Sequence, residues 1–163
     1  MTPFFTIRPF ADSDLASVLA IQHENSSAAQ WAESDYTRLA RDPAGLVLVA
    51  EPSAVGSERR EVVGFAAFHR VLDEAELRNM AVTAGYRRHG AGKALLAEAH
   101  RKLLALGVKR AYLEVRAGNA AAIRLYESVG YRRLSIRRDY YQDPPEDACV
   151  MELIHCAIDP LSH

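Results

Sequence analysis

The chain has little cysteine, no long apolar run and almost no net charge, and each shortage excludes a class of protein. Its two cysteines, Cys149 and Cys156, are too few for a disulfide framework, and they form neither a C-x-x-C motif nor a zinc-ligand spacing with histidine. No apolar run approaches the roughly 20 residues that a membrane-spanning helix needs. The formal net charge of -1 argues against non-specific nucleic-acid binding.

The composition favours one ordinary globular domain, which we expect to cover residues 1–163. Of the residues, 49% are hydrophobic and 25% are charged. The N-terminal stretch MTPFFTIRPFADSD has no basic region followed by a long apolar core, so it indicates no signal peptide, and we expect a reducing, cytoplasmic location. The six histidines are scattered, and we interpret them as surface or packing residues rather than metal ligands.

The hydrophobic pattern predicts strands first and alternating strands and helices later. Asp12 or Ser13 can cap the first helix, Gly107 is expected to stop the third, and the polar stretch 51–61 reads as a hairpin loop. An early antiparallel meander followed by β-α-β units predicts an α/β fold with one mixed, mostly antiparallel sheet of about six to seven strands and helices on both faces. The expected strands are 6–10, 46–50, 62–71, 76–82, 108–116, 131–141 and 148–154, and the later helices are 31–39, a segment ending near 106, and 120–129.

The stretch from 76 to 106 reads as a strand, a basic glycine-containing loop and an amphipathic helix. The first main-chain N–H groups of a helix have no partners within it, and the helix dipole adds partial positive charge at that end. Gly90 and Gly92 let a phosphate approach the backbone closely, and Arg87, Arg88 and Lys93 add full charges. The junction therefore predicts an anion site. The apolar face of the helix is expected to carry Leu95, Leu96, Ala99, Leu103 and Leu106.

Two common phosphate motifs do not fit this loop. A Walker loop needs glycine where Arg87 stands and serine or threonine where Ala94 stands. A dinucleotide fingerprint needs a third glycine where Leu95 stands. The pattern present is R-x-x-G-x-G, from Arg87 to Gly92. A plain surface turn before an amphipathic helix remains an alternative.

A second group of residues lies between 112 and 130. Glu114 interrupts an apolar strand, where a buried carboxylate is costly unless it is used or paired. Strand alternation places Tyr112, Glu114 and Arg116 on one face. Tyr126 follows two turns into the next helix, which Asn119 can cap. The structural alternatives are that Glu114 pairs with a neighbouring arginine, that Tyr126 is a core aromatic and that Asn119 is a cap only.

These residues carry a family resemblance. The motif R-x-x-G-x-G resembles the pyrophosphate loop of the GNAT acetyltransferase superfamily, whose ligand is acetyl-coenzyme A (acetyl-CoA). The segments LEVRAGNAAAIRLYESVGY and IRRDYYQDPPEDACVMEL closely resemble the bacterial ribosomal-protein-alanine N-acetyltransferases, GNAT enzymes that acetylate the N-terminal amine of a small-subunit ribosomal protein. The resemblance is strong from about 71 to 153. It is weaker before that, where Gln30-Trp31 only loosely matches the family's Pro-Trp pair, and Gly118 stands where the family usually has serine.

The resemblance implies acetyl transfer from acetyl-CoA to a protein N-terminal α-amine. Glu114 would be the base, directly or through a water, and Tyr126 the acid that protonates the leaving thiolate. Main-chain N–H groups near Ala81 would polarise the thioester carbonyl and pair with the pantetheine arm. The residues expected to bind the coenzyme are Met80, Ala81, Val82, Arg87, Arg88, His89, Gly90, Ala91, Gly92, Lys93 and Asn119. Those expected to contact the acceptor are Trp31, Tyr140 and Tyr141.

Other readings stay open. A GNAT enzyme could act on a lysine side chain, a polyamine, an aminoglycoside or an amino acid, and a non-catalytic coenzyme-binding module is a third reading. The basic strand with Arg132, Arg133, Arg137 and Arg138 is either a solvated face or an attractive surface for an acidic or ribosomal partner. We expect a monomer or weak dimer, with no metal, no membrane and no direct nucleic-acid partner.

Overall fold

The computed structural model describes residues 4–53 and 61–155, and it contains seven strands and four α-helices within them. Two short 3-10 helices, Asp12–Asp14 and Ala84–Tyr86, precede α1 and α3. The helices are α1 (Leu15–Glu24), α2 (Glu33–Arg41), α3 (Ala91–Ala105) and α4 (Ala120–Ser128). The strands are β1 (Phe5–Pro9), β2 (Gly45–Pro52), β3 (Gly64–Val71), β4 (Glu74–Val82), β5 (Arg110–Arg116), β6 (Arg132–Tyr141) and β7 (Glu146–Ile154).

The strands form one mixed sheet in the order β1-β2-β3-β4-β5-β7-β6. The pairs β1–β2, β2–β3, β5–β7 and β6–β7 are antiparallel, and β4–β5 is parallel. A parallel pair needs a crossover connection, and α3 supplies it between β4 and β5. The mixed α/β sheet expected from the sequence is confirmed.

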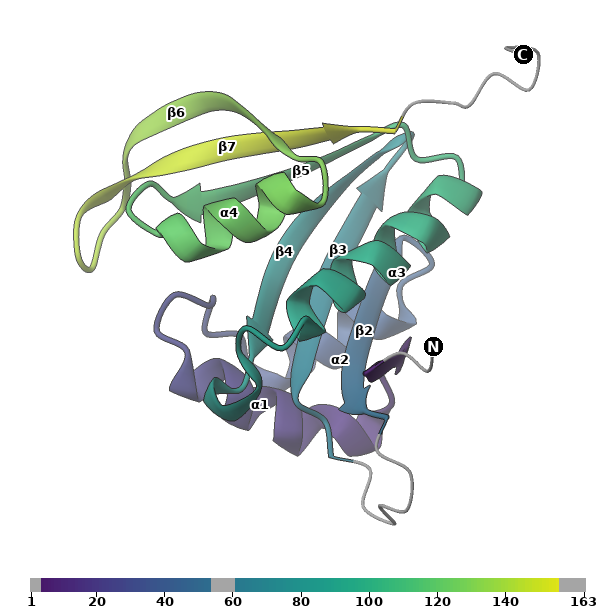
Figure 1. Cartoon of the computed structure of the whole chain (residues 1–163). Helices are drawn as coiled ribbons and strands as arrows, with labels where there is room; N and C mark the ends of the chain where they lie inside the picture. The colour runs from purple at the N-terminus through teal and green to yellow at the C-terminus, as the bar shows by residue number, and fades with distance from the viewer. Residues whose placement is uncertain (1–3, 54–60, 156–163) are drawn as a thin grey trace. The chain divides into compact units, whose positions relative to one another are not determined.

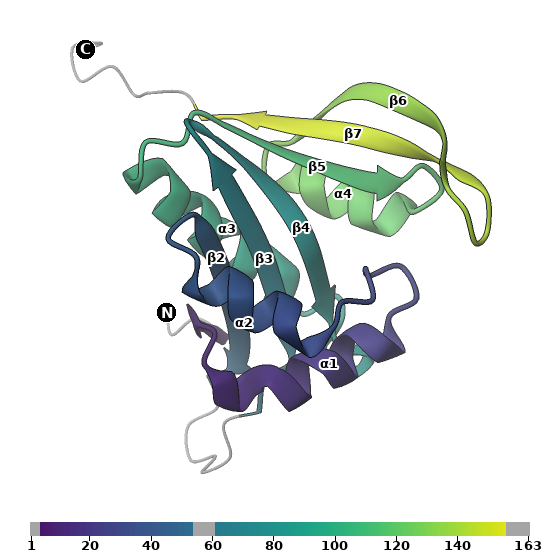
Figure 2. The same cartoon turned by 180° about the vertical axis from the view of Figure 1, so that it is seen from behind.

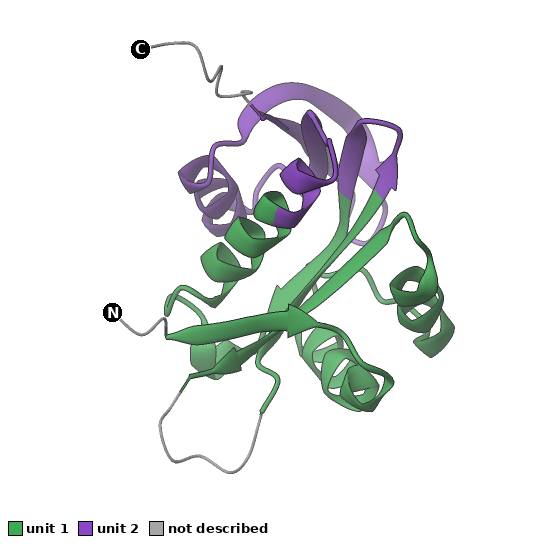
Figure 3. Ribbon diagram, turned by 90° about the vertical axis from the view of Figure 1, so that its right-hand side faces the viewer, with its two compact units in different colours: residues 1–69, 77–101 green, residues 70–76, 102–163 purple. Residues whose placement is uncertain are grey.

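The chain groups into two compact units, which Figure 3 distinguishes by colour. Unit 1 comprises residues 1–69 and 77–101, and unit 2 comprises residues 70–76 and 102–163. Strand β4 and helix α3 each contribute residues to both units. The expectation of a single domain over residues 1–163 stays a prediction.

In unit 1, α1 and α2 cover one face of β2 and β3 (Figure 2) and α3 covers the other (Figure 1). Strand β2 is therefore apolar on both sides, and its residues from Val47 to Ala50 are all buried. Val18 and Ile21 of α1 pack with Tyr36 of α2 against Phe65 of β3. This core explains why an uninterrupted apolar run, rather than an alternating one, marks β2.

The start of α1 differs from the sequence expectation. Neither Asp12 nor Ser13 caps it, because the chain first makes a 3-10 turn and α1 begins at Leu15. Asp14, which is buried, accepts a hydrogen bond from the Ala11 N–H at 2.8 Å and from the Arg8 guanidinium at 2.7 and 2.8 Å. The pairing with Arg8 is a long-range contact that the local pattern could not show.

Three further boundaries correct the sequence reading. Leu106 was placed on the apolar face of α3, but α3 ends at Ala105 and the Leu106 side chain is exposed. Glu51 was assigned to the hairpin loop, but it belongs to β2, and residues 54–60 of that loop lie outside the described residues. The strand expected at 76–82 begins two residues earlier, at Glu74, because the chain turns at the left-handed Leu72 (φ 57°).

In unit 2, α4 packs across β5 and β7 (Figure 1). Ala111, Leu113 and Val115 of β5 are buried, whereas Glu114 and Arg116 between and beyond them are partly exposed. Strand β6 is the edge strand of the sheet, and its register against β7 shifts between Arg133 and Ser135 and again between Arg137 and Tyr141. The expected alternation in β5 is confirmed, and the bulges in β6 are the feature that its sequence did not indicate.

Candidate active site

The loop between β4 and α3, residues 83–90, is the candidate anion site. Arg88 (φ 64°) and Gly90 (φ 91°) are both left-handed, and alternation of such residues with right-handed ones curls successive N–H groups toward a common point. Helix α3 begins at once with Ala91, so its first N–H groups add to this set. A Cβ on Gly90 would meet nothing within 4 Å, so the left-handed φ, and not crowding, accounts for this glycine.

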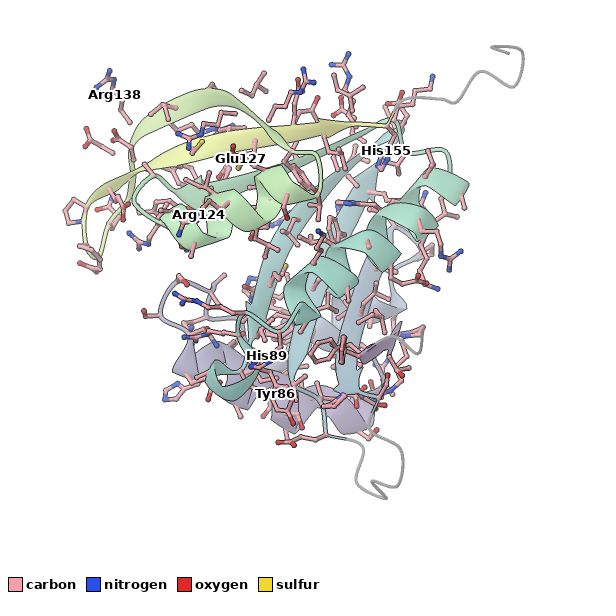
Figure 4. All side chains as sticks on the ribbon, in the orientation of Figure 1. Tyr86, His89, Arg124, Glu127, Arg138 and His155 are labelled. Carbon is pink, nitrogen blue, oxygen red and sulfur yellow. The ribbon has the colours of Figure 1, made fainter. Side chains whose placement is uncertain are left out.

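The basic residues of the β4–α3 loop and of the first turn of α3 differ in their contacts with the protein. Arg88, His89 and Lys93 are exposed, and the His89 ring meets the edge of the Tyr86 ring at 6.5 Å between centroids (Figure 4). Arg87 is also exposed, but its guanidinium is hydrogen-bonded to the protein. It donates to Asn25 Oδ1 and, at 3.3 Å, to the carbonyl of Val82. The arginine that opens the R-x-x-G-x-G motif is therefore engaged before any ligand arrives.

Strand β4 alternates regularly to its end, with Ala75, Leu77, Asn79 and Ala81 buried. Arg78 lines a cavity beside α2. The buried Asn79 also reaches α2, where its amide donates to the Tyr36 hydroxyl at 2.9 Å. Asn79 Oδ1 also accepts from the Met80 N–H at 3.1 Å. The role expected for Met80, Ala81 and Val82 toward the thioester stays a prediction.

Trp31 is the acceptor-contact candidate in unit 1. Its main chain is held by the Gln22 amide, which donates to Trp31 O at 2.7 Å and accepts from its N–H at 3.2 Å. Its ring packs 5.1 Å from the Tyr36 ring. The tryptophan also lines a cavity of about 340 Å³, in which the two carboxylates are balanced by two guanidinium groups. The other lining residues are Asp35, Arg38, Leu39, Asp42, His69 and Arg78.

Glu114 lies within a small polar cluster of unit 2. Its carboxylate is 3.4 Å from Arg137 Nε, and its side chain is 20% exposed. A hydrogen bond to Glu114 is the main cause that raises the pKa of Tyr140, whose ring lies against the Arg137 guanidinium. The pairing with an arginine, raised as a structural alternative, is thus present. It leaves the carboxylate partly accessible and beside one of the expected acceptor contacts.

Tyr126 is positioned on α4 with its ring edge-on to Tyr131, 5.9 Å between centroids. Burial, with a smaller effect of Tyr141, raises the pKa of Tyr126 to about 12. A phenol with this pKa remains protonated at neutral pH, which is the state that a general acid needs. Tyr126 therefore has the protonated form that the expected role requires, and the role itself stays a prediction.

Asn119 caps α4, as its position predicted. Its Oδ1 accepts from the Ala122 N–H at 3.2 Å. The preceding Gly118 donates its N–H to Glu146 Oε2 at 2.6 Å, and a Cβ on Gly118 would lie 2.8 Å from that same oxygen. Glycine in place of the family's usual serine therefore fits the Glu146 side chain where it lies in this chain.

The sequence reading missed a residue that holds the loop from 142 to 145. Arg116 donates to the carbonyl of Pro144 at 3.0 Å and pairs with Glu146 at 3.5 Å. Its guanidinium also lies over the Tyr141 ring, 4.3 Å from the centroid. The only signal in the sequence was the position of Arg116 on the Glu114 face of β5.

The basic strand β6 does not form a single positive surface. Arg133 pairs with Glu127 of α4 at 3.4 Å, whereas Arg137 pairs with Glu114 of β5. Arg138 extends away from the strand (Figure 4). The arginine side chains therefore point in different directions and have different partners. This favours the interpretation of β6 as a solvated strand.

Among residues 4–53 and 61–155, no group of three or more histidine, cysteine, aspartate or glutamate side chains could hold a metal ion. In the same ranges, every helix is too short or too polar to cross a membrane. Cys149 is a buried free thiol, and Cys156 lies outside the described residues.

Comparison with known proteins gives one consistent result. The [ribosomal protein bS18]-alanine N-acetyltransferase of Escherichia coli (strain K12) is 48% identical over 99 residues, which are 60% of this chain and 67% of that protein. A crystal structure of the Escherichia coli ribosomal-protein-alanine N-acetyltransferase has a TM-score of 0.78 at 36% identity, covering 98% of this chain and 99% of that one. The corresponding Brucella melitensis structure has a TM-score of 0.78 at 26% identity, covering 92% and 99%.

The family follows from a match that spans most of the chain. The model of the acetyltransferase (GNAT) family matches residues 15–131, which include β4, the β4–α3 loop, β5 and α4. These elements carry the candidate anion site, Glu114 and Tyr126. The chain therefore belongs to the GNAT acetyltransferase family and is an acetyl-CoA-dependent N-acetyltransferase.

Proposed function

We propose that this chain acetylates the N-terminal α-amine of a protein and that a ribosomal protein is its favoured acceptor. The similarity to ribosomal-protein-alanine N-acetyltransferases supports this acceptor. The observation that carries the proposal is the partly accessible Glu114 carboxylate beside the Tyr140 phenol. A ribosomal acceptor places the reaction in the cytoplasm, and we expect the chain to act there as a monomer or weak dimer.

The β4–α3 loop fits the diphosphate of acetyl-CoA. The left-handed Arg88 and Gly90 and the first turn of α3 present main-chain N–H groups, and the Arg88 and Lys93 side chains supply positive charge. We expect Arg88, His89, Gly90, Ala91, Gly92 and Lys93 to hold the diphosphate and Met80, Ala81, Val82 and Asn119 to contact the pantetheine arm. When bound, acetyl-CoA supplies the activated acyl group.

The remaining chemistry belongs to two side chains. An α-amino group has a pKa of about 7.7–8.0, so a carboxylate is a sufficient base to take its proton near neutral pH. Glu114 would accept that proton at Oε1 or Oε2, directly or through a water. Tyr126 would hold, on its hydroxyl, the proton that the departing sulfur takes up. Its raised pKa of about 12 keeps that proton in place at neutral pH.

A panel of acceptors tests the proposal. Thioester consumption is measured with short peptides that carry ribosomal-protein N-termini, and with the same peptides blocked at the N-terminus but containing lysine. Spermidine, free lysine and an aminoglycoside complete the panel. We expect turnover with free N-termini only, and a mass increase of one acetyl group at the α-amine. Turnover with a different amine, or binding of coenzyme A without any turnover, would overturn the proposal.

A further inference from the structure

The Arg87 side chain points at protein groups rather than at the anion site. Its guanidinium donates hydrogen bonds to the carbonyl of Val82, at 3.3 Å, and to Asn25 Oδ1. Asn25 is the first residue of the α1–α2 loop, residues 25–32, and it is 9% exposed. A buried amide of this kind needs both of its polar atoms satisfied. Arg87 satisfies the oxygen, so the arginine completes the hydrogen bonding of a residue 62 positions away.

The nitrogen end of the Asn25 amide is also engaged. It donates to the carbonyl of Ile21 in the last turns of α1, at 2.7 Å, and to the carbonyl of Val82, at 3.4 Å. The adjacent Glu24 accepts hydrogen bonds from the Thr83 hydroxyl and from the Ala84 N–H, at 3.1 Å for the latter. Four side-chain contacts thus join Glu24 and Asn25 to the segment from Val82 to Arg87.

The contacts continue from Asn25 to Trp31 inside the α1–α2 loop. Gln30, which stands in place of the family's proline, donates its amide to the carbonyls of Gln22, Asn25 and Ala28, at 2.8, 3.3 and 3.2 Å. Gln22 in turn holds both main-chain groups of Trp31. A proline would restrict this loop through its ring, whereas here hydrogen bonds fix it. Hydrogen-bonded residues therefore connect Arg87 to Trp31.

We propose that Arg87 is a positioning residue for the acceptor, which holds the Trp31-bearing α1–α2 loop against the β4–α3 loop, and that it is not a phosphate ligand. The identities of the two ligands, a protein N-terminus as acceptor and the diphosphate of acetyl-CoA, rest on the proposed function. Arg88 is exposed at the left-handed turn, and it is the arginine that we assign to the diphosphate. This proposal differs from the expectation, based on the family resemblance, that both Arg87 and Arg88 bind the coenzyme.

The forked shape of the guanidinium group allows an experiment to distinguish a positioning role of Arg87 from phosphate binding. A phosphate can be held by the point charge of lysine, but Arg87 reaches two oxygens of neutral groups with different nitrogens of one planar guanidinium. Lysine at position 87 would keep the charge near the anion site and would lose this fork. Arg87→Lys should therefore behave like Arg87→Gln if the residue is a positioning residue.

The experiment measures three quantities in full-length protein: the acceptor KM, the affinity for coenzyme A by calorimetry, and acrylamide quenching of Trp31, the single tryptophan of the chain. For Arg87→Gln and Arg87→Lys we expect an acceptor KM raised about tenfold, stronger quenching without any ligand, and coenzyme affinity within about threefold of wild type. Asn25→Ala should reproduce these changes, and the double variant Asn25→Ala/Arg87→Gln should be no worse than either single variant.

Comparison variants make the outcome specific. Arg88→Gln should weaken coenzyme binding and leave Trp31 quenching unchanged, and Arg124→Gln, on the exposed side of α4 (Figure 4), should change neither. Unchanged quenching in Arg87→Gln, or recovery of wild-type behaviour in Arg87→Lys, overturns the inference. If wild type acetylates no peptide, the proposed function fails, but quenching and calorimetry still decide the role of Arg87.

Discussion

Glu114 is the single residue on which the proposed base chemistry depends. Replacing it by glutamine keeps the shape and removes the proton acceptor, so we expect kcat/KM to fall by about 10²–10⁴, most strongly below neutral pH, where the acceptor amine is protonated. The pH profile of peptide acetylation measures this. Glu127→Gln is the control, because it makes the same carboxylate-to-carboxamide change at an exposed position of α4, and it should retain activity. An unchanged profile in Glu114→Gln removes the residue from this role.

Tyr126 provides a second test at the scale of one atom. Tyr126→Phe removes only the hydroxyl, and we expect a rate loss of about 10²–10⁴ with coenzyme affinity unchanged. Because burial raises the pKa of Tyr126 to about 12, the acid form persists below that pH. Loss of this proton should therefore cause no decline in wild-type activity up to about pH 10. Full activity in the phenylalanine variant would make Tyr126 an ordinary packing residue.

Two roles of Asn119, capping helix α4 and binding the coenzyme, can be tested separately. Asn119→Ala removes the hydrogen bond to Ala122 N–H, so we expect a loss of about 1 kcal/mol and a Tm lower by roughly 2–4 °C. Asn119→Ser keeps a capping oxygen and should retain the Tm. If the amide also contacts acetyl-CoA, the serine variant will bind coenzyme more weakly despite its normal stability. Equal affinity in Asn119→Ser would show that the residue is a cap only.

The elements were largely predictable because their signals are local. The R-x-x-G-x-G loop, the Asn119 cap and the alternation around Glu114 each depend on residues within a few positions, and all three occur as expected. The partners of Arg87 and Arg116 were not predictable, since they join residues 62 and 28 positions apart. Leu106 was misplaced because periodicity cannot show that a helix ends one residue earlier.

An ion-paired group in unit 1 joins its first strand to β2 and to the 3-10 helix that precedes α1. Arg8 binds Asp14 and Glu51, whose side chains are each 7% exposed. Arg8→Met leaves both carboxylates without their cation, and we expect a loss at the lower end of about 3–5 kcal/mol in denaturant unfolding, because Arg8 itself is 27% exposed. Arg41→Met, which breaks the exposed Arg41–Asp12 pair, should cost less than about 1 kcal/mol.

The same group predicts a direction for the dependence of stability on pH. Burial alone would raise the pKa of Asp14, but hydrogen bonds from Arg8 and the Ala11 N–H, with the Arg8 charge, lower it below its ordinary value. Because the pKa of Asp14 is lower in the folded state, the ionised carboxylate stabilises the fold above the unfolded-state pKa of about 3.9. This stabilisation is lost as the pH falls through the folded-state pKa. The difference between wild type and Arg8→Met should therefore be largest near neutral pH and shrink below about pH 4. A difference that grows on acidification would contradict this account.

For the whole molecule, the central claim is that main-chain N–H groups of the β4–α3 loop and the first turn of α3 hold the diphosphate of acetyl-CoA. A crystal structure of the chain with acetyl-CoA tests it most directly. We predict density for the diphosphate against the N–H groups between Arg88 and Lys93, with the Arg87 guanidinium still on Asn25. Diphosphate density at any other place on the chain would contradict the claim.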